Sequence, residues 1–455
     1  MSALGAAGAD CTLAVDFESA ESAIRSREFD LYVLDLKIPS RSNSLDAKAE
    51  NGQALYGLIC KESPGTPIRV LTSSEPGKFL RKLVSFGEML DIWGSGDEIP
   101  LIGYFDKEEA TELIDQIREY SGIIAATDSI PLNSRGIKLD LSQTQQRAIR
   151  SFVRSVGGTS CDLRKLAGLS GSVVMRIVVK DSKGRTLSEV VGKIGNRLKV
   201  EREITAYNGH VKNLKIGLFA HIVSQQNKGL HQASSVFYRL ADSYDRTFFE
   251  VANEDPKLAA KVVSEVRKGL ETWSNAREQV NVKVQEIRSS LIQDNIFKPT
   301  AIKTSLQSHE VIEDNEIAAT RSCCHGDLHG ANILVANNGS AVIIDYGDVG
   351  SSFSCLDPIT LELSLIFHPD ASEISSELSP LLHNWGRQDL YTEGNRFKPL
   401  IDACRDWAYD VAGGDLAVLA VAYSFVARQL KFDTVDKSVT VALATSLLEQ
   451  LRESH

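Results

Sequence analysis

One short segment in the C-terminal half combines the residue types that phosphoryl transfer requires. Residues 325–334 read HGDLHGANIL, and residues 343–348 read IIDYGD. Phosphoryl transfer from a nucleotide needs a carboxylate that orients the attacking hydroxyl, and oxygen ligands that hold magnesium against the phosphates. Asp327 suits the first role, and Asn332 and Asp345 suit the second. The segment therefore predicts a magnesium-dependent site for phosphoryl transfer.

The spacing of these residues predicts a loop followed by a hairpin. The turn residues 337–340 (NNGS) separate the apolar runs 332–335 and 341–344, a pattern typical of a β-hairpin. The second run would form a buried strand with Asp345 at its exposed end, where a carboxylate without a metal would be costly. A hairpin with capping Asp and Asn residues explains each residue singly, but it does not explain the whole string.

The string resembles the catalytic loop and metal-binding motif of the aminoglycoside phosphotransferase and choline kinase-like family, a branch of the protein-kinase-like fold. The resemblance implies that Asp327 is the catalytic base, that Asn332 and Asp345 bind magnesium, and that His325 supports the loop backbone. It also implies ATP and Mg as cofactors. Asp357 resembles the aspartate that buttresses this loop from the following helix, although a helix N-cap beside a proline explains Asp357 equally well.

The segment before this loop carries weaker nucleotide-binding signals. A glycine-rich turn between two strands could let backbone N–H groups approach phosphates, and a plain hairpin turn is the alternative. The strand 236–240 and the residues after it resemble the hinge that binds the adenine edge. The nucleotide-binding candidates are Gly168, Ser170, Gly171, Ser172, Leu240 and Ala241.

A lysine in an apolar strand supplies a further candidate. Lys193 lies within residues 190–194 (VVGKI), and a lysine there needs an anion, which in kinases is the α/β-phosphate. A side chain that reaches the sheet edge is the alternative. Glu203, on the helix that follows, is the expected ion-pair partner of Lys193. Glu201 is the second choice, because the two glutamates lie on different faces of that helix.

Two departures from protein kinases favour a hydroxyl of a small molecule as the acceptor. Gly326 replaces the arginine of the His-Arg-Asp motif, and residues 348–356 are too few for an activation segment. A non-catalytic nucleotide-sensing module and a kinase acting on a partner protein are the alternatives. Asp406, Asp410 and Asp415 could form an acidic wall for a cationic acceptor, or they could belong to solvated helix faces.

The first 120 residues alternate short apolar strands with helical patterns, which predicts parallel βαβ units. Residues 31–39 (LYVLDLKIP) resemble the phosphoacceptor strand of a response-regulator receiver domain. That resemblance implies Asp35 as the acceptor, Thr72 as the switch hydroxyl and Lys107 as the counter-charge. The acidic pair that would hold magnesium is absent. We therefore expect a degenerate, flavodoxin-like receiver that docks a protein partner or forms a homodimer; an incomplete N-terminus is the alternative.

The length of 455 residues predicts several domains. We expect an α/β receiver-like domain (1–122), a linker (123–142), a β-rich kinase-like N-lobe (143–245) and a helical C-lobe (246–455), the last two forming an α+β bilobal domain. Residues 12–15 are strand-like, and residues 257–293 read as mostly helical. A net charge of −10 argues against nucleic acid as a partner. The scattered cysteines and the lack of a signal peptide or long apolar stretch predict a cytoplasmic protein without a membrane span.

Overall fold

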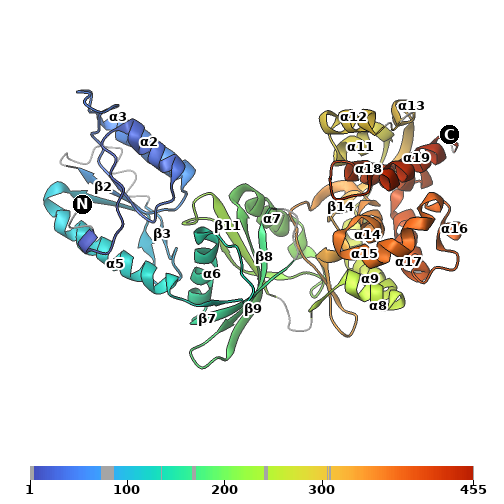
Figure 1. The fold of residues 1–455 in the computed structure, drawn as a ribbon, viewed down its shortest axis with the longest axis horizontal. Helices are drawn as coiled ribbons and strands as arrows, with labels where there is room; N and C mark the ends of the chain where they lie inside the picture. Colours follow the sequence, from blue (N-terminus) through green and yellow to red (C-terminus); the bar gives the residue numbers. More distant parts are fainter. Residues whose placement is uncertain are drawn as a thin grey trace. The chain divides into compact units, whose positions relative to one another are not determined.

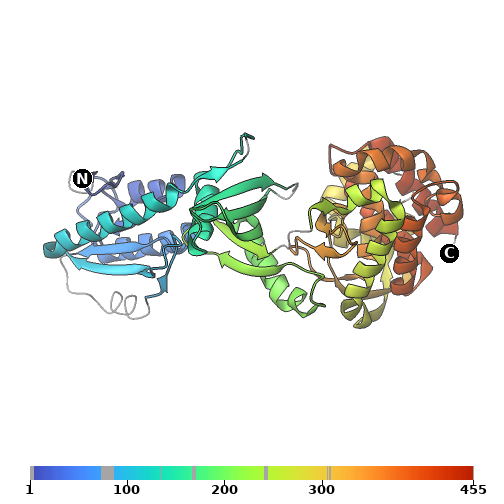
Figure 2. The same ribbon diagram turned by 90° about the horizontal axis from the view of Figure 1, so that it is seen from below.

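The computed structural model of the protein describes residues 5–72, 87–134, 136–166, 171–239, 244–304, 306 and 309–453. The chain forms two compact units. Unit 1 comprises Met1–Arg202 and His221–Leu240, and unit 2 comprises Glu203–Ala220 and Ala241–His455. Figure 1 and Figure 2 show the elements along the chain.

Unit 1 begins with a three-stranded parallel sheet in the order β1-β2-β5. Its apolar strands and the inward faces of the flanking helices form one core, which includes Leu34, Leu55 and Val70. The predicted parallel βαβ arrangement is thereby confirmed. The elements are α2 (Phe17–Ser26), β1 (Tyr32–Leu34), α3 (Ala49–Glu62), β2 (Ile68–Thr72), β5 (Ile102–Asp106) and α5 (Ala110–Asp128), with the two-residue strands β3 (Met89–Leu90) and β4 (Ile99–Pro100).

Two expectations for this region are wrong. Residues 12–15 form no strand; the chain there is extended coil that leads into α2. Asp16 ends this segment by capping α2, where its carboxylate accepts a hydrogen bond from Ser19 N (2.8 Å). The predicted linker 123–142 is partly regular structure, because α5 continues to Asp128 and Leu132–Asn133 form β6.

The second part of unit 1 is a six-stranded sheet in the order β10-β11-β9-β8-β7-β6, antiparallel except for the parallel pair β6–β7. Helix α6 (Gln143–Ser155) packs on it, with Phe152 stacked on Phe237 at 4.1 Å between ring centroids. The apolar runs 161–166, 173–180, 190–194, 221–225 and 236–240 predict strands here, and a strand is found at each of them. The strands are β7 (Ser160–Lys165), β8 (Val173–Lys180), β9 (Thr186–Asn196), β10 (His221–Gln226) and β11 (Ala233–Arg239).

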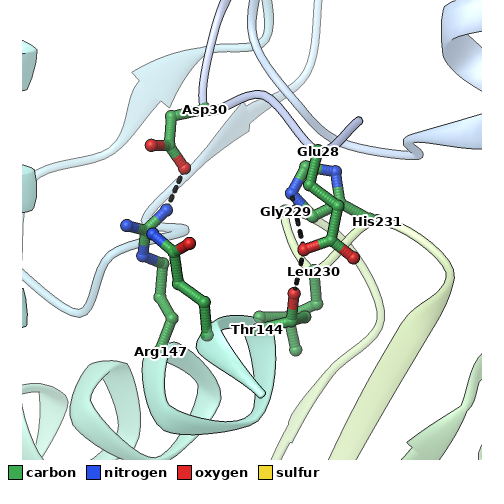
Figure 3. Close-up of a pocket in the computed structure, with 8 residues that line it drawn as sticks. Glu28, Asp30, Thr144, Arg147, Gly229, Leu230 and His231 are labelled. Carbon is green, nitrogen blue, oxygen red and sulfur yellow. Dashed lines mark hydrogen bonds and ion pairs between the residues drawn. The ribbon is translucent and has the colours of Figure 1, made fainter. Parts of the chain in front are cut away.

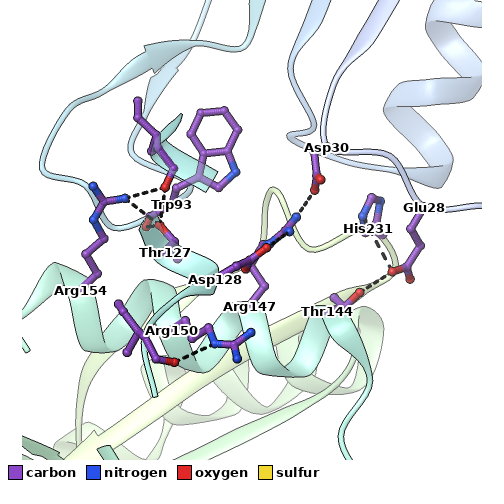
Figure 4. Close-up of polar contacts among 12 residues, drawn as sticks. Glu28, Asp30, Trp93, Thr127, Asp128, Thr144, Arg147, Arg150, Arg154 and His231 are labelled. Atoms are coloured by element: carbon purple, nitrogen blue, oxygen red, sulfur yellow. Dashed lines mark hydrogen bonds and ion pairs between the residues drawn. The ribbon is translucent and has the colours of Figure 1, made fainter. Parts of the chain in front are cut away.

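Polar contacts join the two parts of unit 1. Arg147, on α6, forms ion pairs with Asp30 and Asp128, and Thr144 donates a hydrogen bond to Glu28. His231, in the turn between β10 and β11, lies beside Glu28 in a small pocket (Figure 3). Figure 4 shows that these contacts line up along α6. The α/β part is therefore fixed to the β-sheet part through buried charge as well as apolar packing.

Unit 2 is mainly helical and includes the small antiparallel sheets β12-β15-β16 and β13-β14-β17. Their strands include β12 (Arg246–Thr247), β15 (Ile333–Val335), β16 (Ala341–Ile343) and β17 (Gly350–Phe353). Helices α14 (Leu356–Phe367) and α18 (Asp415–Gln429) are almost wholly buried. Helix α7 (Arg197–Gly209) runs from unit 1 into unit 2. Unit 2 also contains the helices α8 (Phe248–Glu254), α9 (Pro256–Gly269), α16 (Gln388–Thr392), α17 (Lys398–Ala412) and α19 (Lys437–Glu453).

The expectation of mostly helical structure over residues 257–293 is confirmed except at residues 278–283. Strand β13 (Glu278–Lys283) interrupts the helices and pairs with β14 (Glu316–Cys324). In the described part of the chain no single helix is long and apolar enough to cross a membrane. By length and composition alone the pair α17 and α18, bent by 115°, would pass that test.

Candidate active site

The loop that carries Asp327 is held by a buried carboxylate. Asp357, in the first turn of α14, accepts hydrogen bonds from His325 N (2.7 Å) and Gly326 N (2.9 Å). Burial raises the pKa of Asp357, while His325 and the two backbone N–H groups oppose this shift. The contact expected from the family resemblance is therefore present, and it fixes the backbone immediately before Asp327.

Gly326 is required at its position by backbone geometry. Its φ is +82°, and a Cβ there would lie 2.5 Å from the carbonyl oxygen of Asp348. No side chain fits at that distance, and L-residues rarely adopt this conformation. The glycine in place of the kinase arginine thus lets two segments of the site approach closely.

Asn332 and Asp345 lie at the same edge of the β15–β16 hairpin, which is formed by Ile333–Val335 and Ala341–Ile343. Ile344 N donates to Asn332 O (3.0 Å), and Ile344 O lies 3.1 Å from His325 Nε2. Asp345 has a φ of +64° directly after this contact, an unusual conformation for a residue other than glycine. The predicted hairpin therefore brings these residues to the loop.

The amide of Asn332 is oriented by two neighbours. Its Nδ2 donates to Asp327 O (2.9 Å) and lies 3.2 Å from His329 Nε2. Because the amide nitrogen is engaged on this side, the side-chain oxygen remains as a donor atom for a cation. An amide oxygen and the Asp345 carboxylate are hard ligands of the kind that Mg²⁺ accepts, with phosphates and waters completing its shell. The residues present fit the ion.

The imidazole of His329 lies beside the loop, with Nε2 3.7 Å from Asp327 Oδ2. Burial, the largest influence, lowers the pKa of His329 to about 4, whereas the charges of Asp327 and Asp345 both raise it. Among the described residues, no group of three or more His, Cys, Asp or Glu side chains could hold a metal ion. The candidate magnesium ligands are thus one carboxylate and one amide.

Sequence analysis missed the residues that approach this loop from distant elements. Arg428 Nη2, on α18, lies 3.5 Å from Asp327 Oδ1. The rings of His329 and His368 have centroids 4.8 Å apart, and His368 directly follows α14. No local pattern links residues 327, 368 and 428. Only His329, inside the motif, had a signal that could have singled it out.

The other candidates for nucleotide binding lie in different parts of the chain. Lys193 is buried on β9, in register with Val174 and Val236. Glu203 is fully buried on α7, whereas Glu201 pairs with Arg197 at 3.7 Å. The pairing of Lys193 with Glu203 stays a prediction.

The glycine-rich turn and the hinge fall largely outside the described residues, which exclude Gly168, Ser170, Leu240 and Ala241. Gly171 has a φ of +73° with open space where a Cβ would lie, and Ser172 is buried. The part of the turn that the structure describes thus has the left-handed backbone that a glycine permits.

In the N-terminal domain, two of the three receiver-like candidates meet. Lys107 Nζ lies 2.6 Å from Asp35 Oδ2. Asp35 directly follows β1 and Lys107 directly follows β5, so the pair forms at the carboxyl edge of the parallel sheet. Thr72 ends β2 beside Asp106, and its side chain lies outside the described part.

No protein-family model matches this chain. None of the curated proteins matches it. Among solved structures, it is similar to an aminoglycoside-3′-phosphotransferase of type VIII, at 16% identity over 58% of this chain and 100% of that chain, with a TM-score of 0.34.

Two further solved structures are an ethanolamine kinase from Plasmodium vivax and a choline kinase from Streptococcus pneumoniae. The first has 12% identity over 76% of this chain and 96% of that chain, with a TM-score of 0.34. The second has 12% identity over 54% of this chain and 93% of that chain, with a TM-score of 0.28. By their names, all three proteins phosphorylate small molecules. Because the TM-scores lie below 0.5, the activity of this chain is inferred from its own residues.

Proposed function

We propose that this protein is an ATP- and magnesium-dependent phosphotransferase that acts on a hydroxyl group of a small molecule. The observation that carries the proposal is the Asp327 loop. Asp357 holds its backbone, and the hairpin sets Asn332 and Asp345 next to it. A purely structural loop has no use for this combination of an accessible carboxylate and two adjacent oxygen ligands.

Each residue has a distinct role in the proposed reaction. Asp327, one third exposed, accepts the proton of the acceptor hydroxyl, whose oxygen then attacks the γ-phosphorus. Asn332 and Asp345 would hold magnesium, which neutralises charge on the β- and γ-phosphates. Lys193, oriented by Glu203, would bind the α- and β-phosphates.

The test is nucleotide turnover by the purified full-length chain. With magnesium ATP and a panel of hydroxyl acceptors, Asp327→Asn should lower the rate of ADP formation by about 10²–10⁴-fold without loss of the fold. Asp389→Asn is the matched control, because Asp389 is exposed on α16. Equal turnover by wild type and Asp327→Asn would reject Asp327 as the base. Nucleotide binding without turnover by wild type would favour the sensing module instead.

For the N-terminal domain we propose a docking or dimerisation role based on the receiver-like fold. The missing acidic pair supports it, because the Asp35–Lys107 pair supplies the acceptor and its counter-charge but not the further carboxylates that would hold magnesium. Treatment of the protein with acetyl phosphate and magnesium, followed by mass spectrometry, tests this role. A phosphoryl group on Asp35 would contradict a purely docking domain.

A further inference from the structure

Two basic side chains lie beside the candidate base, and the proposed function gives neither of them a role. Arg428, in the last turn of α18, directs Nη2 towards Asp327 Oδ1 at 3.5 Å. Lys431 follows three residues later, and its backbone N–H donates to Arg428 O (3.4 Å). This turn of helix-like backbone places both side chains on the same side of the segment.

Lys431 belongs to the same cluster of charged side chains as Arg428 and Asp327. Burial lowers the pKa of Lys431, and the positive charge of Arg428 lowers it further, whereas Asp327 and Asp348 raise it. The ammonium lies over the ring of Phe432 at 4.7 Å, and within the described part of the chain it forms no ion pair. Two cations therefore face the catalytic loop from one side.

The contact between Arg428 and Asp327 differs from a fixed, buried ion pair. It is one loose approach, and the Arg428 side chain is 21% exposed. By contrast, Arg405 binds both oxygens of Glu362 and is fully buried. Arg428 thus has N–H donors to offer to another anion.

The acidic residues considered for a cationic acceptor lie elsewhere. Asp410, on α17, forms an ion pair with Arg267 on α9 (3.0 Å). Asp415 begins α18, and a helical rise of about 1.5 Å per residue places it roughly 20 Å from Arg428. The Arg428 guanidinium brings a positive charge to the Asp327 carboxylate, which favours an anionic group on the acceptor at this point.

We propose that the acceptor carries an oxyanion, a phosphate ester or a carboxylate, in addition to its hydroxyl, and that Arg428 and Lys431 bind this group. The inference rests on the proposed function. A planar guanidinium matches both oxyanions in two-point contacts, and an ammonium adds a second charge. Asp327 accepts the hydroxyl proton. The hydroxyl oxygen then bonds to the γ-phosphorus of ATP as the bond to the β-phosphate oxygen breaks, and ADP leaves.

The first test is acceptor choice. Each acceptor has a hydroxyl: glycerol is neutral, glycerol 3-phosphate carries a phosphate ester, glycerate carries a carboxylate, and ethanolamine carries a cation. A wider metabolite panel can be sorted in the same way. We expect phosphorylated products from acceptors with an oxyanion. In the double variant R428Q/K431Q, the KM for such an acceptor should rise about tenfold to hundredfold, with the KM for ATP within about twofold. R452Q/K303Q removes the same charges from exposed positions and is the control.

Three results would overturn the inference. The first is a preference for neutral or cationic acceptors. The second is an unchanged acceptor KM in the double variant. The last is a loss of ATP hydrolysis in the double variant that is as large without acceptor as with it. The last result would mean that Arg428 acts on the transferred phosphoryl group. If the double variant does not fold, the single variant Lys431→Gln serves, because Lys431 is exposed.

A second measurement does not depend on turnover. Inorganic phosphate is titrated into the protein loaded with magnesium and a non-hydrolysable ATP analogue, and its Kd is compared between wild type and R428Q/K431Q. We expect binding weakened about tenfold or more in the variant; equal binding would contradict the cation pair as an oxyanion site. Weakened phosphate binding without any Asp327-dependent ADP formation would reject the proposed function separately.

Discussion

Asp327 owes its position to backbone contacts rather than to its own side chain. Its carbonyl accepts from Asn332, and the two residues before it donate backbone N–H groups to Asp357. This arrangement leaves the Asp327 carboxylate accessible, with Arg428 approaching it loosely at 3.5 Å and His329 at 3.7 Å. A base must be held in this way, because close contacts to the carboxylate itself would compete with the substrate.

Gly326→Ala tests this close approach. The added Cβ would meet Asp348 O at 2.5 Å in a backbone conformation that alanine rarely adopts, so we expect a loss of about 1–3 kcal/mol in the free energy of unfolding. The rate of phosphoryl transfer should fall as well, since the loop must shift. Urea denaturation and ADP formation measure the two effects. Gly350→Ala is the control, because nothing lies within 4 Å of its Cβ position; equal effects of both variants would contradict the steric account.

The turn between β10 and β11 makes the stability of unit 1 depend on pH. Burial lowers the pKa of His231, an effect that the charge of Glu28 opposes and that of Arg147 reinforces. The unfolded chain takes up a proton near pH 6.5, while folded His231 resists it, so stability is retained above about pH 6.5 and is lost as the pH falls below this value. The slope is at most about 1.4 kcal/mol per pH unit for this group.

We therefore expect His231→Asn to reduce the loss of stability between pH 7.5 and pH 5.5, measured by urea denaturation. Asparagine tolerates the positive φ of +51° at this position. His383→Asn, an exposed substitution, should leave the pH dependence unchanged. A wild-type pH dependence in the His231 variant would show that other groups cause it.

Elements with strong local patterns could be predicted from the sequence. The predicted strands 68–72 and 173–180 agree residue by residue with β2 and β8, and the predicted helix 143–156 is one residue longer than α6. Apolar runs and a capping serine determine these elements locally. Strand β13 was missed, since its residues 278–283 (EQVNVK) alternate weakly and form a strand only by pairing with β14.

In the candidate site, too, the residues within a local sequence pattern could be predicted, and those brought in by tertiary packing could not. Asp327, Asn332 and Asp345 lie within 19 residues of sequence, and a hairpin pattern was enough to predict their proximity. Arg428 lies 101 residues from Asp327, and it reaches the site only through the packing of α18 against other helices. The sequence contains no signal for such a contact, because it depends on tertiary structure alone.

Across the whole molecule, the sheet with Lys193 belongs to the same compact unit as the N-terminal sheet β1-β2-β5. Arg147 connects the two parts, and its side chain is 8% exposed between two aspartates. Burial lowers the pKa of Arg147, which the charge of Glu28 opposes, and burial raises the pKa of Asp128, which the charge of Arg150 opposes. An arginine so enclosed stabilises unit 1 only while both carboxylates are present.

Arg147→Gln should therefore loosen the contact between the two parts of unit 1. Because the aspartates are 31% and 40% exposed, water compensates part of the loss, and we expect a decrease of about 1–3 kcal/mol in the free energy of unfolding. Hydrogen exchange should become faster in α6 and in the segment around Asp30, while β14 and α18 of unit 2 keep their protection. Arg164→Gln, at an exposed position on β7, is the control. If exchange rises equally in both variants, or in unit 2 as strongly as in unit 1, Arg147 does not hold the α/β part to the sheet, and apolar packing alone accounts for the compactness of unit 1.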